Sequence, residues 1–419
     1  MKSKRMSVSS KKRSFLLVIG VFLLLTGFSP LGAEETPCSY TDLFEEIGAV
    51  VRGNFYDPER IDERFPEIQA GYRARIARAS TRKEFSDLVN RMLRELNASH
   101  TYYLTPEDSE YYRLCALFSE IPEIGALFQG RDVLYPSVGI LTQTIEARVF
   151  VAAVLAGSVA EKAGVLMGDE ILSVNGEPYT PVASLRSSVG KEATFEVRRK
   201  AEAAPLTIAM RPVTVKPMQE LLEAQRASTR VIERAGTKIG YVHLYSYAGY
   251  EYHEELLNAV TWGTLKEADA LIIDLRYGLG GAAPSYLNIF NTNIPILEMY
   301  DRDGAETVFD SQWRKPAVYL VNGFSRSGKE LLAFGARKYR LATVIGERTP
   351  GHVLGGRLFP LSNGDALYLA VQHCRVDGVD LEGVGVAPDI EVPFDIRYCA
   401  GHDLQLEKAL EHLAGKVAG

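Results

Sequence analysis

Three stretches between residues 34 and 130 place apolar side chains three and four positions apart. These stretches are residues 43–51, 67–79 and 83–96. Such spacing lines one face of an α-helix, so we predict a helical segment over residues 34–130. The third helix is expected to end at residues 97–101, where short polar side chains hydrogen-bond locally and favour a turn.

Residues 131–215 change to short apolar runs separated by glycine and asparagine. The expected strands are 139–141, 149–154, 170–174, 193–197 and 206–210, with a short helix at 160–163. Asn175-Gly176 is a strong signal for a two-residue β-turn, because both residues tolerate the positive φ that such turns need. This pattern predicts a small β-rich domain.

Residues 216–419 alternate strands with helices. Strands are expected at 239–244, 270–275, 317–321 and 343–346, helices at 252–266, 329–339 and 403–413, and a hairpin at Asn363-Gly364. Alternation of this kind is typical of a layered α/β core.

Composition supports a folded, multidomain chain. The 419 residues are 46% hydrophobic and 24% charged, close to a folded globular average, and the length suits two or three domains. The net charge is −6, although the first 33 residues hold six cations and no acid. An acidic body without a basic stripe is a poor match for nucleic acid, so we expect no nucleic-acid partner.

The amino-terminal segment has the layout of a secretory signal peptide. Its cations precede an apolar run at residues 15–28 and small residues up to Ala33. As a helix this run would rise about 21 Å, less than the roughly 30 Å of a hydrocarbon core. We therefore predict a signal peptide over residues 1–33 and an exported protein, periplasmic or secreted. The alternative is an uncleaved membrane anchor, the one membrane contact that we expect.

Four cysteines remain after that segment: Cys38, Cys115, Cys374 and Cys399. In an oxidising compartment they allow one or two disulfides, and buried free thiols are the alternative. Neither the cysteines nor the histidines show ligand spacing, so we expect no metal and no cofactor.

A candidate nucleophile lies between the strand at 317–321 and the helix at 329–339. The stretch reads Asn-Gly-Phe-Ser-Arg-Ser-Gly-Lys-Glu and holds Ser325 and Ser327. Free N–H groups and the dipole at a helix start can stabilise an oxyanion. The plainer interpretation is that either serine caps the helix. Lys329, two residues after Ser327, is expected to point elsewhere.

Two nucleotide-binding patterns touch this part of the chain and are both disfavoured. Gly323-x-x-x-x-Gly328-Lys329 matches a phosphate-binding P-loop until Glu330 replaces the Ser or Thr that binds Mg²⁺. Residues 278–283 resemble a dinucleotide fingerprint weakly and open no clean amphipathic helix. We expect no nucleotide ligand.

The order of motifs along the chain resembles the carboxyl-terminal processing (tail-specific) peptidases and the related tricorn core peptidase. The motifs are the β-rich segment, ALIIDLRYGLGG at 270–281, NGFSRSGKE at 322–330, TVIGERTPGH at 343–352 and DLEGVGVAPDIEV at 380–392. This resemblance implies a serine peptidase with a crotonase-like βα core, an N-terminal helical segment and an inserted PDZ-like domain. The implied domains are 1–33, 34–130, 131–215 and 216–419.

The resemblance also assigns roles to single residues. In this family the nucleophilic serine lies three residues before a glutamate of the following helix. That glutamate is Glu330 here, which selects Ser327 over Ser325. Histidine stands where Ser–Lys members of the family carry their lysine base, at His352. The tricorn branch uses a serine–histidine pair from an earlier segment and a glutamate in the closing motif.

On this basis we expect His100 to be the base, in hydrogen-bond contact with Ser327. Glu382 would orient it, Ser99 would assist, and His352 is the alternative base. The implied oxyanion donors lie at Gly280-Gly281 and on Gly328, where glycine allows the backbone to approach substrate closely. Without this resemblance, Gly280-Gly281 would be interpreted as an ordinary tight turn.

Residues 137–179 resemble a PDZ domain, with Ser137, Val138, Gly139 and Ile140 as its carboxylate-binding loop. Such loops bind a chain terminus while the peptide adds as a strand; a PDZ-like spacer or lid is the alternative. The expected function is an exported serine endopeptidase acting on unstructured or carboxyl-terminal segments of proteins. The rival is a non-catalytic peptide-binding protein on a degenerate peptidase fold.

Overall fold

The computed structural model describes residues 39–419, and the predicted signal peptide lies outside them. Three helices open the described chain: α1 (Tyr40–Asn54), α2 (Pro58–Ile76) and α3 (Arg82–Arg94). Each begins where a polar side chain, Ser39, Asp57 or Thr81, accepts a hydrogen bond from an amide of the first turn. The predicted helices are confirmed here.

These helices pack on a small sheet whose strands come from distant parts of the sequence. Its order is β1 (Tyr102–Leu104), β17 (Ala366–Gln372) and β16 (Gly355–Pro360), all antiparallel. Phe44, Phe65 and Phe85 of the helices share one apolar cluster with Leu367 and Leu369 of β17. The helical segment thus also contains a strand that helical periodicity did not predict. Asn363-Gly364 turns between β16 and β17, as expected.

Helices α4 (Ser109–Leu117) and α5 (Pro122–Leu127) lead to β2 (Tyr135–Ser137), which pairs with β8 (Val213–Val215). A β-rich unit is inserted between these two paired strands. Its sheet has the order β3 (Ile140–Ile145), β4 (Arg148–Val154), β5 (Glu170–Val174), β6 (Ala193–Arg198) and β7 (Leu206–Met210). Short helices α6 (Val159–Lys162) and α7 (Ala183–Arg186) contribute to its separate core.

The turn at Asn175-Gly176 forms, with φ of 55° and 82°, and is closed by reciprocal hydrogen bonds between Val174 and Glu177. However, the segments that flank this turn pair only at Val174 and Glu177. Strand β5 pairs with β6 only after the chain has passed through α7.

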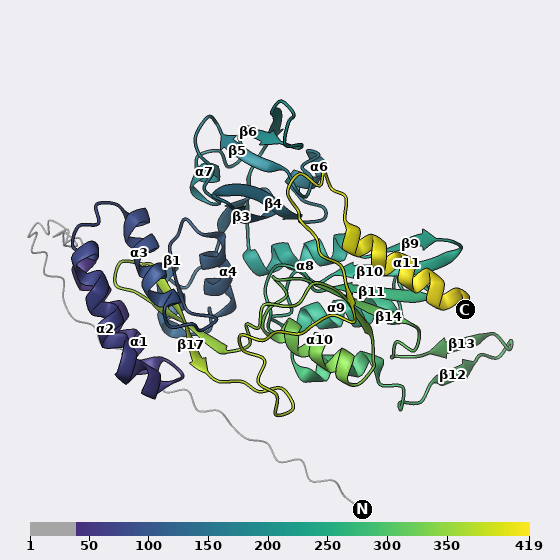
Figure 1. The fold of residues 1–419 in the computed structure, drawn as a ribbon. Helices are drawn as coiled ribbons and strands as arrows, with labels where there is room; N and C mark the ends of the chain where they lie inside the picture. Colours follow the sequence, from purple (N-terminus) through teal and green to yellow (C-terminus); the bar gives the residue numbers. More distant parts are fainter. Residues whose placement is uncertain (1–38) are drawn as a thin grey trace, which may run out of the picture. The chain divides into compact units, whose positions relative to one another are not determined.

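A six-stranded sheet forms the centre of the remaining chain (Figure 1). Its order is β18 (Ile390–Glu391), β15 (Thr343–Gly346), β14 (Ala317–Val321), β11 (Ala270–Asp274), β10 (Thr237–His243) and β9 (Arg230–Arg234). All neighbours are parallel except β9 and β10. The carboxyl ends of β10, β11, β14 and β15 therefore meet at one edge, where parallel α/β sheets place their sites.

Alternate residues of these strands face opposite layers. In β11, Ala270 and Ile272 pack with Leu413 of α11 (Leu404–Ala418), while Leu271 and Ile273 join the larger core. That core includes apolar residues of α9 (Tyr250–Thr261) and α10 (Gly328–Lys338). Helix α8 (Pro217–Ser228) links β8 to β9. Both faces of the sheet are covered, which explains the nearly continuous apolar strands.

Two further elements lie between β11 and β14: the 3₁₀ helix η1 (Pro284–Phe290) and a hairpin of β12 (Leu297–Tyr300) with β13 (Glu306–Phe309). Among the described residues no helix has the length and apolar character that crossing a bilayer demands. Cys115, Cys374 and Cys399 are free thiols, while Cys38 lies outside the described residues.

Candidate active site

Ser327 occupies the junction between β14 and α10 in a strained conformation. Its φ is 59° and its ψ is −130°, and as the first flanking residue of α10 it makes no side-chain capping hydrogen bond. A non-glycine residue held there costs about 1–3 kcal/mol, and such strain clusters at functional sites. A serine on a strained strand-to-helix turn, with a free hydroxyl, has the geometry of a nucleophile elbow.

Ser325 has a different environment. It is buried, and its Oγ accepts the amide proton of Asn322 at 3.0 Å while its own amide donates to the Asn322 carbonyl. These bonds close the turn before the helix. Ser325 is therefore engaged in holding the loop, whereas the hydroxyl of Ser327 is left free.

A buried glutamate fixes the loop that follows β15 to the start of α10. The Glu330 carboxylate accepts hydrogen bonds from Thr349 Oγ1 (2.6 Å) and from the amides of Gly351 (2.8 Å) and His352 (2.6 Å). In return, the amide of Ser327 donates to the His352 carbonyl at 2.7 Å. Burial raises the pKa of Glu330, although these donors favour its ionised form. Ser327 is thus held through its backbone, not its side chain.

Ser99, His100 and Glu382 form a hydrogen-bonded chain. Ser99 Oγ lies 2.9 Å from His100 Nδ1 and donates to Glu382 Oε2 at 3.0 Å, while the Ser99 amide donates to Oε1 at 2.8 Å. A hydroxyl carries one proton, and a carboxylate only accepts. Ser99 Oγ must therefore accept from His100 Nδ1–H, which leaves the lone pair on Nε2. This is the tautomer that a general base for serine requires.

The environment of His100 favours its neutral form. The residue is 8% exposed and sits at a φ of 53°. Burial, with the nearby charges of Arg326 and His352, lowers the pKa of His100 to about 3. The imidazole is neutral at pH 7. A proton accepted at Nε2 would be favoured by the charge of Glu110 and by the hydrogen bond through Ser99 to Glu382.

Glu382 also reaches the loop that holds Ser327. Its Oε2 accepts from the amides of Val353 (2.9 Å) and Leu354 (3.3 Å), directly after His352. One loop, residues 349–354, is therefore bonded to the Ser327 helix through Glu330 and to Ser99 through Glu382. This shared loop brings the predicted serine and histidine segments together.

A half-buried ion pair also links the Ser327 loop to the segment that follows His100. Arg326 donates to Glu110 of α4 at 2.5 Å and to the Tyr102 hydroxyl at 3.4 Å, and that hydroxyl donates to Glu110 at 2.7 Å. This pair was not predicted from the sequence. Its members are 216 residues apart, and nothing local marks either one.

The expected contact between Ser327 and His100 does not form within residues 39–419. Neither Ser327 Oγ nor His100 Nε2 makes a hydrogen bond there. Catalytic hydrogen bonds are often long in ligand-free sites and tighten when substrate binds.

The glycines expected at the oxyanion site pack tightly around Ser327. A Cβ on Gly280 would lie 2.5 Å from the Ser327 Cβ, and one on Gly328 would lie 2.2 Å from the amide nitrogen of Ala282. Gly281 has a φ of 93°. Only glycine fits these positions, and among residues 39–419 their amides find no acceptor.

His352, the alternative base, has an exposed side chain that lines a cavity of about 330 Å³ together with Phe324, Arg326 and Leu141. Desolvation lowers its pKa, while Glu382 acts in the opposite direction. Its imidazole makes no hydrogen bond to any described residue. Nothing orients this ring as Ser99 orients His100.

The expected carboxylate-binding loop, Ser137 to Ile140, is largely buried. The Gly139 amide donates to Ser137 Oγ at 2.9 Å, and that hydroxyl donates to the Glu220 carboxylate. Glu220 would oppose a second carboxylate at this point. By contrast, β3 is an edge strand, paired only with β4 in the described sheet.

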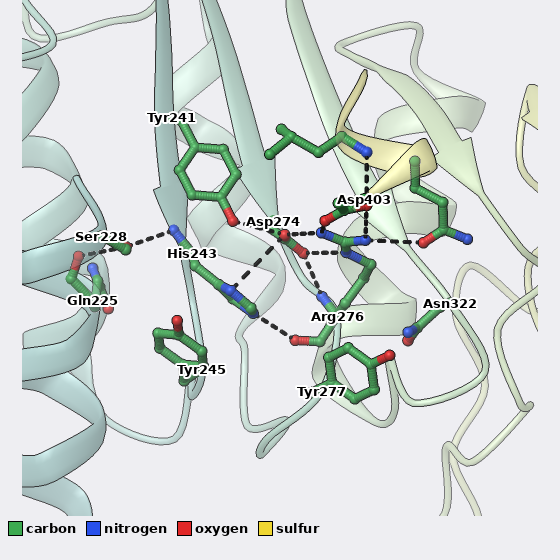
Figure 2. A network of polar contacts seen from close by, with 12 residues as sticks. Gln225, Ser228, Tyr241, His243, Tyr245, Asp274, Arg276, Tyr277, Asn322 and Asp403 are labelled. Atoms are coloured by element: carbon green, nitrogen blue, oxygen red, sulfur yellow. Dashed lines mark hydrogen bonds and ion pairs between the residues drawn. The ribbon is translucent and has the colours of Figure 1, made fainter. Parts of the chain in front are cut away.

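A second polar network lies at the carboxyl end of β11 (Figure 2). Arg276 forms two-pronged ion pairs with Asp274 (2.9 and 2.6 Å) and with Asp403 (2.9 and 2.7 Å). His243 Nε2 lies 2.9 Å from the Arg276 carbonyl oxygen. The sequence does contain a signal for this network, because charged residues follow directly after a buried apolar run. We did not predict the network from it. The network anchors the start of the segment that ends at Gly281.

The described residues contain no group of three or more His, Cys, Asp or Glu side chains placed to hold a metal ion.

Three sequence families match this chain in the order that its motifs predict. Peptidase family S41 matches residues 238–392, the PDZ domain matches 150–199, and the tricorn protease C1 domain matches 38–94. The chain carries a peptidase S41 domain, preceded by the tricorn C1 and PDZ matches. This domain makes it a serine-type peptide hydrolase and confirms the resemblance, and the mixed α/β fold is confirmed as well.

Relatives of this peptidase come from both branches of the resemblance. It is 26% identical to a carboxyl-terminal-processing protease of Synechocystis over 80% of this chain and 78% of the relative. It is 27% identical to tricorn protease homolog 2 of Streptomyces coelicolor, over 85% of this chain but 30% of that protein's length. The tricorn protease crystal structure superposes with a TM-score of 0.55 at 18% identity, over 91% of this chain and 37% of that one, which supports the fold.

Proposed function

We propose that this S41 peptidase cleaves unstructured or carboxyl-terminal segments of proteins with Ser327 as nucleophile, His100 as base and Glu382 as orienting group. The observation that carries the proposal is the hydrogen-bonded chain from Glu382 through Ser99 to His100 Nδ1. It leaves Nε2 as the free base. The same loop that binds Glu382 holds the strained Ser327.

In this mechanism Ser327 Oγ attacks the carbonyl carbon of the scissile bond as its proton passes to His100 Nε2. The C–N bond then breaks, and the leaving amine takes the proton from His100. Water attacks the acyl ester with His100 again as base, and the proton returns to Ser327 Oγ as the acid product leaves. General base help contributes about 10²–10⁴ in rate. Each oxyanion donor, here assigned to Gly280 or Gly281 and to Gly328, contributes roughly 3 kcal/mol.

We infer that the substrate chain reaches the site along the free edge of β3. Leu141 and Thr142 of that strand line the 330 Å³ cavity that also contains His352 and Arg326. A peptide added to an edge strand is held by main-chain hydrogen bonds, which suits unstructured segments of any sequence. The Ser137–Ile140 loop lies at the start of this strand, where Glu220 disfavours a terminal carboxylate. We therefore propose that the β-rich domain binds substrate mainly by strand addition at β3, and less by binding a terminal carboxylate.

We also propose that residues 1–33 direct export, so that the peptidase works in the periplasm or outside the cell. The cationic start and short apolar run carry this proposal. Fusing residues 1–40 to a reporter that is active only after export tests it. A reporter that stays inactive would contradict export.

Labelling with a fluorophosphonate tests the enzyme against the rival, a binding protein without a working site. We expect the folded wild-type chain to be labelled on Ser327 and the Ser327→Ala variant to be unlabelled. Ser173→Ala, which changes a half-buried serine on β5, is the control and should label normally. A folded wild-type chain that resists the probe would support the binding protein.

A further inference from the structure

Lys329 is a buried lysine that the proposed reaction does not use. Its side chain is 0% exposed, and no carboxylate of residues 39–419 forms an ion pair with it. The single hydrogen bond of its ammonium group runs from Nζ to the Tyr277 carbonyl oxygen at 2.5 Å. The residue is thus next to the candidate nucleophile in sequence but directed at a different segment.

This placement is unfavourable for stability. Burying an ammonium group without a partner charge costs several kcal/mol, which an apolar side chain of similar volume avoids. Lys329 is also in the first turn of α10, where the helix dipole repels cations. Burial lowers the pKa of Lys329 to about 7, which reflects the same cost. The fold alone gives no reason for a lysine here.

The carbonyl that Lys329 holds belongs to a strained residue. Tyr277 has a φ of 57°, and it follows Arg276, whose own carbonyl lies 2.9 Å from His243 Nε2 (Figure 2). Two consecutive carbonyls are therefore each held by a buried side chain. Without its donor, the Tyr277 carbonyl would be a buried acceptor left unpaired, and the peptide could rotate to relieve the strain.

The segment after Tyr277 leads directly to the nucleophile. The Leu279 amide donates to the Tyr245 carbonyl at 2.8 Å, and the Gly280 backbone then passes against Ser327. A rotation at Tyr277 would be transmitted along these few residues to Gly280 and Gly281. Oxyanion donors must lie within a few tenths of an ångström of their place, so such a shift would weaken the transition state more than substrate binding.

We infer that Lys329 is a positioning residue, whose hydrogen bond to the Tyr277 carbonyl holds the Gly280-Gly281 backbone in place to receive the oxyanion at Ser327. The inference rests on the proposed function of that serine. Lys329 does not touch the reacting atoms. Its Nζ donates to a carbonyl oxygen, so it is not placed to take the proton of Ser327.

The test compares Lys329→Met, which keeps the volume and removes the donor, with Lys315→Met. Lys315 Nζ donates to the Ala268 carbonyl at 2.6 Å, so it is a second lysine-to-carbonyl contact, made by an exposed residue at the opposite end of the sheet. We expect Lys329→Met to lower kcat for peptide hydrolysis by about 10- to 100-fold with KM changed less than about threefold. Its urea unfolding midpoint should be equal to or above that of the wild type. Lys315→Met should keep kcat.

Each other result contradicts the inference. A Lys329→Met chain with wild-type kcat would show that the donor is dispensable. A chain that does not fold, or that loses activity together with stability, would show a merely structural lysine. If the wild-type chain hydrolyses no peptide and resists the fluorophosphonate, the proposed function fails and the inference falls with it. If the wild-type chain is labelled but Lys329→Met keeps the wild-type kcat, the inference fails and the proposed function stands.

Discussion

At the scale of single residues, the strain at Ser327 separates a functional serine from a capping one. A capping serine would use its Oγ on the first-turn amides, and Ser327 does not. It instead occupies a backbone region that glycine adopts readily and other residues resist. Stability is therefore reduced at the position where we propose that a side chain acts as nucleophile.

Replacing Ser327 with glycine or alanine measures this strain. Both variants should lose hydrolysis and labelling. We expect Ser327→Gly to have a free energy of unfolding about 1 kcal/mol above that of Ser327→Ala, although glycine normally destabilises by entropy. Urea denaturation followed by circular dichroism gives both values. A less stable glycine variant would mean that the turn is relaxed.

The depressed pKa of His100 predicts an unusual pH profile. The base is active when neutral, and its pKa of about 3 lies far below the ordinary 6.5. We expect kcat/KM to stay within about threefold between pH 7 and pH 5 and to fall only as the pH approaches 3. Folding at each pH is checked by circular dichroism. An acid limb near 6.5 would contradict this environment for the base.

The same shift has a consequence for stability. Because the folded state binds this proton less readily than the unfolded state, the contribution of His100 is fully present above about pH 6.5. It is lost as the pH falls towards the folded value.

The sequence could predict these residues only in part. Ser325 and Ser327 are equally placed between a strand and a helix, and the motif order of the family was needed to select one. The pairing of Ser99-His100 with Glu382 likewise came from that motif order. Arg326 with Glu110 was missed because neither residue carries a local signal and only folding brings them together.

At the scale of elements, loop 349–354 connects the serine and histidine segments of the candidate site. Glu330 of α10 holds its first half, and Glu382 holds its second half. Two carboxylates thus fix one loop, which in turn anchors Ser327 through the His352 carbonyl. Movement of this loop would separate the proposed nucleophile, Ser327, from the proposed base, His100.

Glu330→Gln tests how much the carboxylate of Glu330 contributes to holding this loop. The glutamine would keep one acceptor oxygen and place an amide NH₂ against backbone N–H donors. We expect the free energy of unfolding to fall by about 2–3 kcal/mol, since buried donors lose their partner. Differential scanning calorimetry measures it, with Glu407→Gln on the exposed side of α11 as control. A loss below about 0.5 kcal/mol for Glu330→Gln would show that the loop is held by other contacts.

Elements with strong local patterns were predicted well. Strands β5, β7, β14 and β15 occupy the expected residues, because each is a short apolar-rich run bounded by turn residues. Strand β1 was missed since it has three residues and gains its partner, β17, from a distant part of the chain. The turn at Asn175-Gly176 formed, but local turn chemistry could not tell how far its arms would extend.

At the scale of the whole molecule, the β-rich domain is inserted between β2 and β8, and its edge strand β3 borders the 330 Å³ cavity that Arg326 and His352 also line. The family predicted this insertion, whereas the direction of the free edge could be learnt only from the fold. A substrate strand on β3 would run beside this cavity and be held mainly by its backbone.

Backbone methylation of the substrate tests strand addition. In a series of peptides carrying one N-methyl group each, alternate positions should raise KM by about 5- to 30-fold, the equivalent of one lost hydrogen bond of roughly 1–2 kcal/mol. The intervening positions should be tolerated, because their N–H groups point away from β3. Steady-state kinetics gives KM for each peptide. A uniform effect at all positions would contradict strand addition.

The central claim is that an imidazole from an upstream loop, oriented through Ser99 and Glu382, activates Ser327. Peptide hydrolysis by His100→Ala and His352→Ala tests it most directly, because both variants keep every backbone contact of the site. We expect His100→Ala to lower kcat by about 10²–10⁴ and His352→Ala to lower it by less than tenfold. The reverse result, with activity lost only in His352→Ala, would contradict the claim.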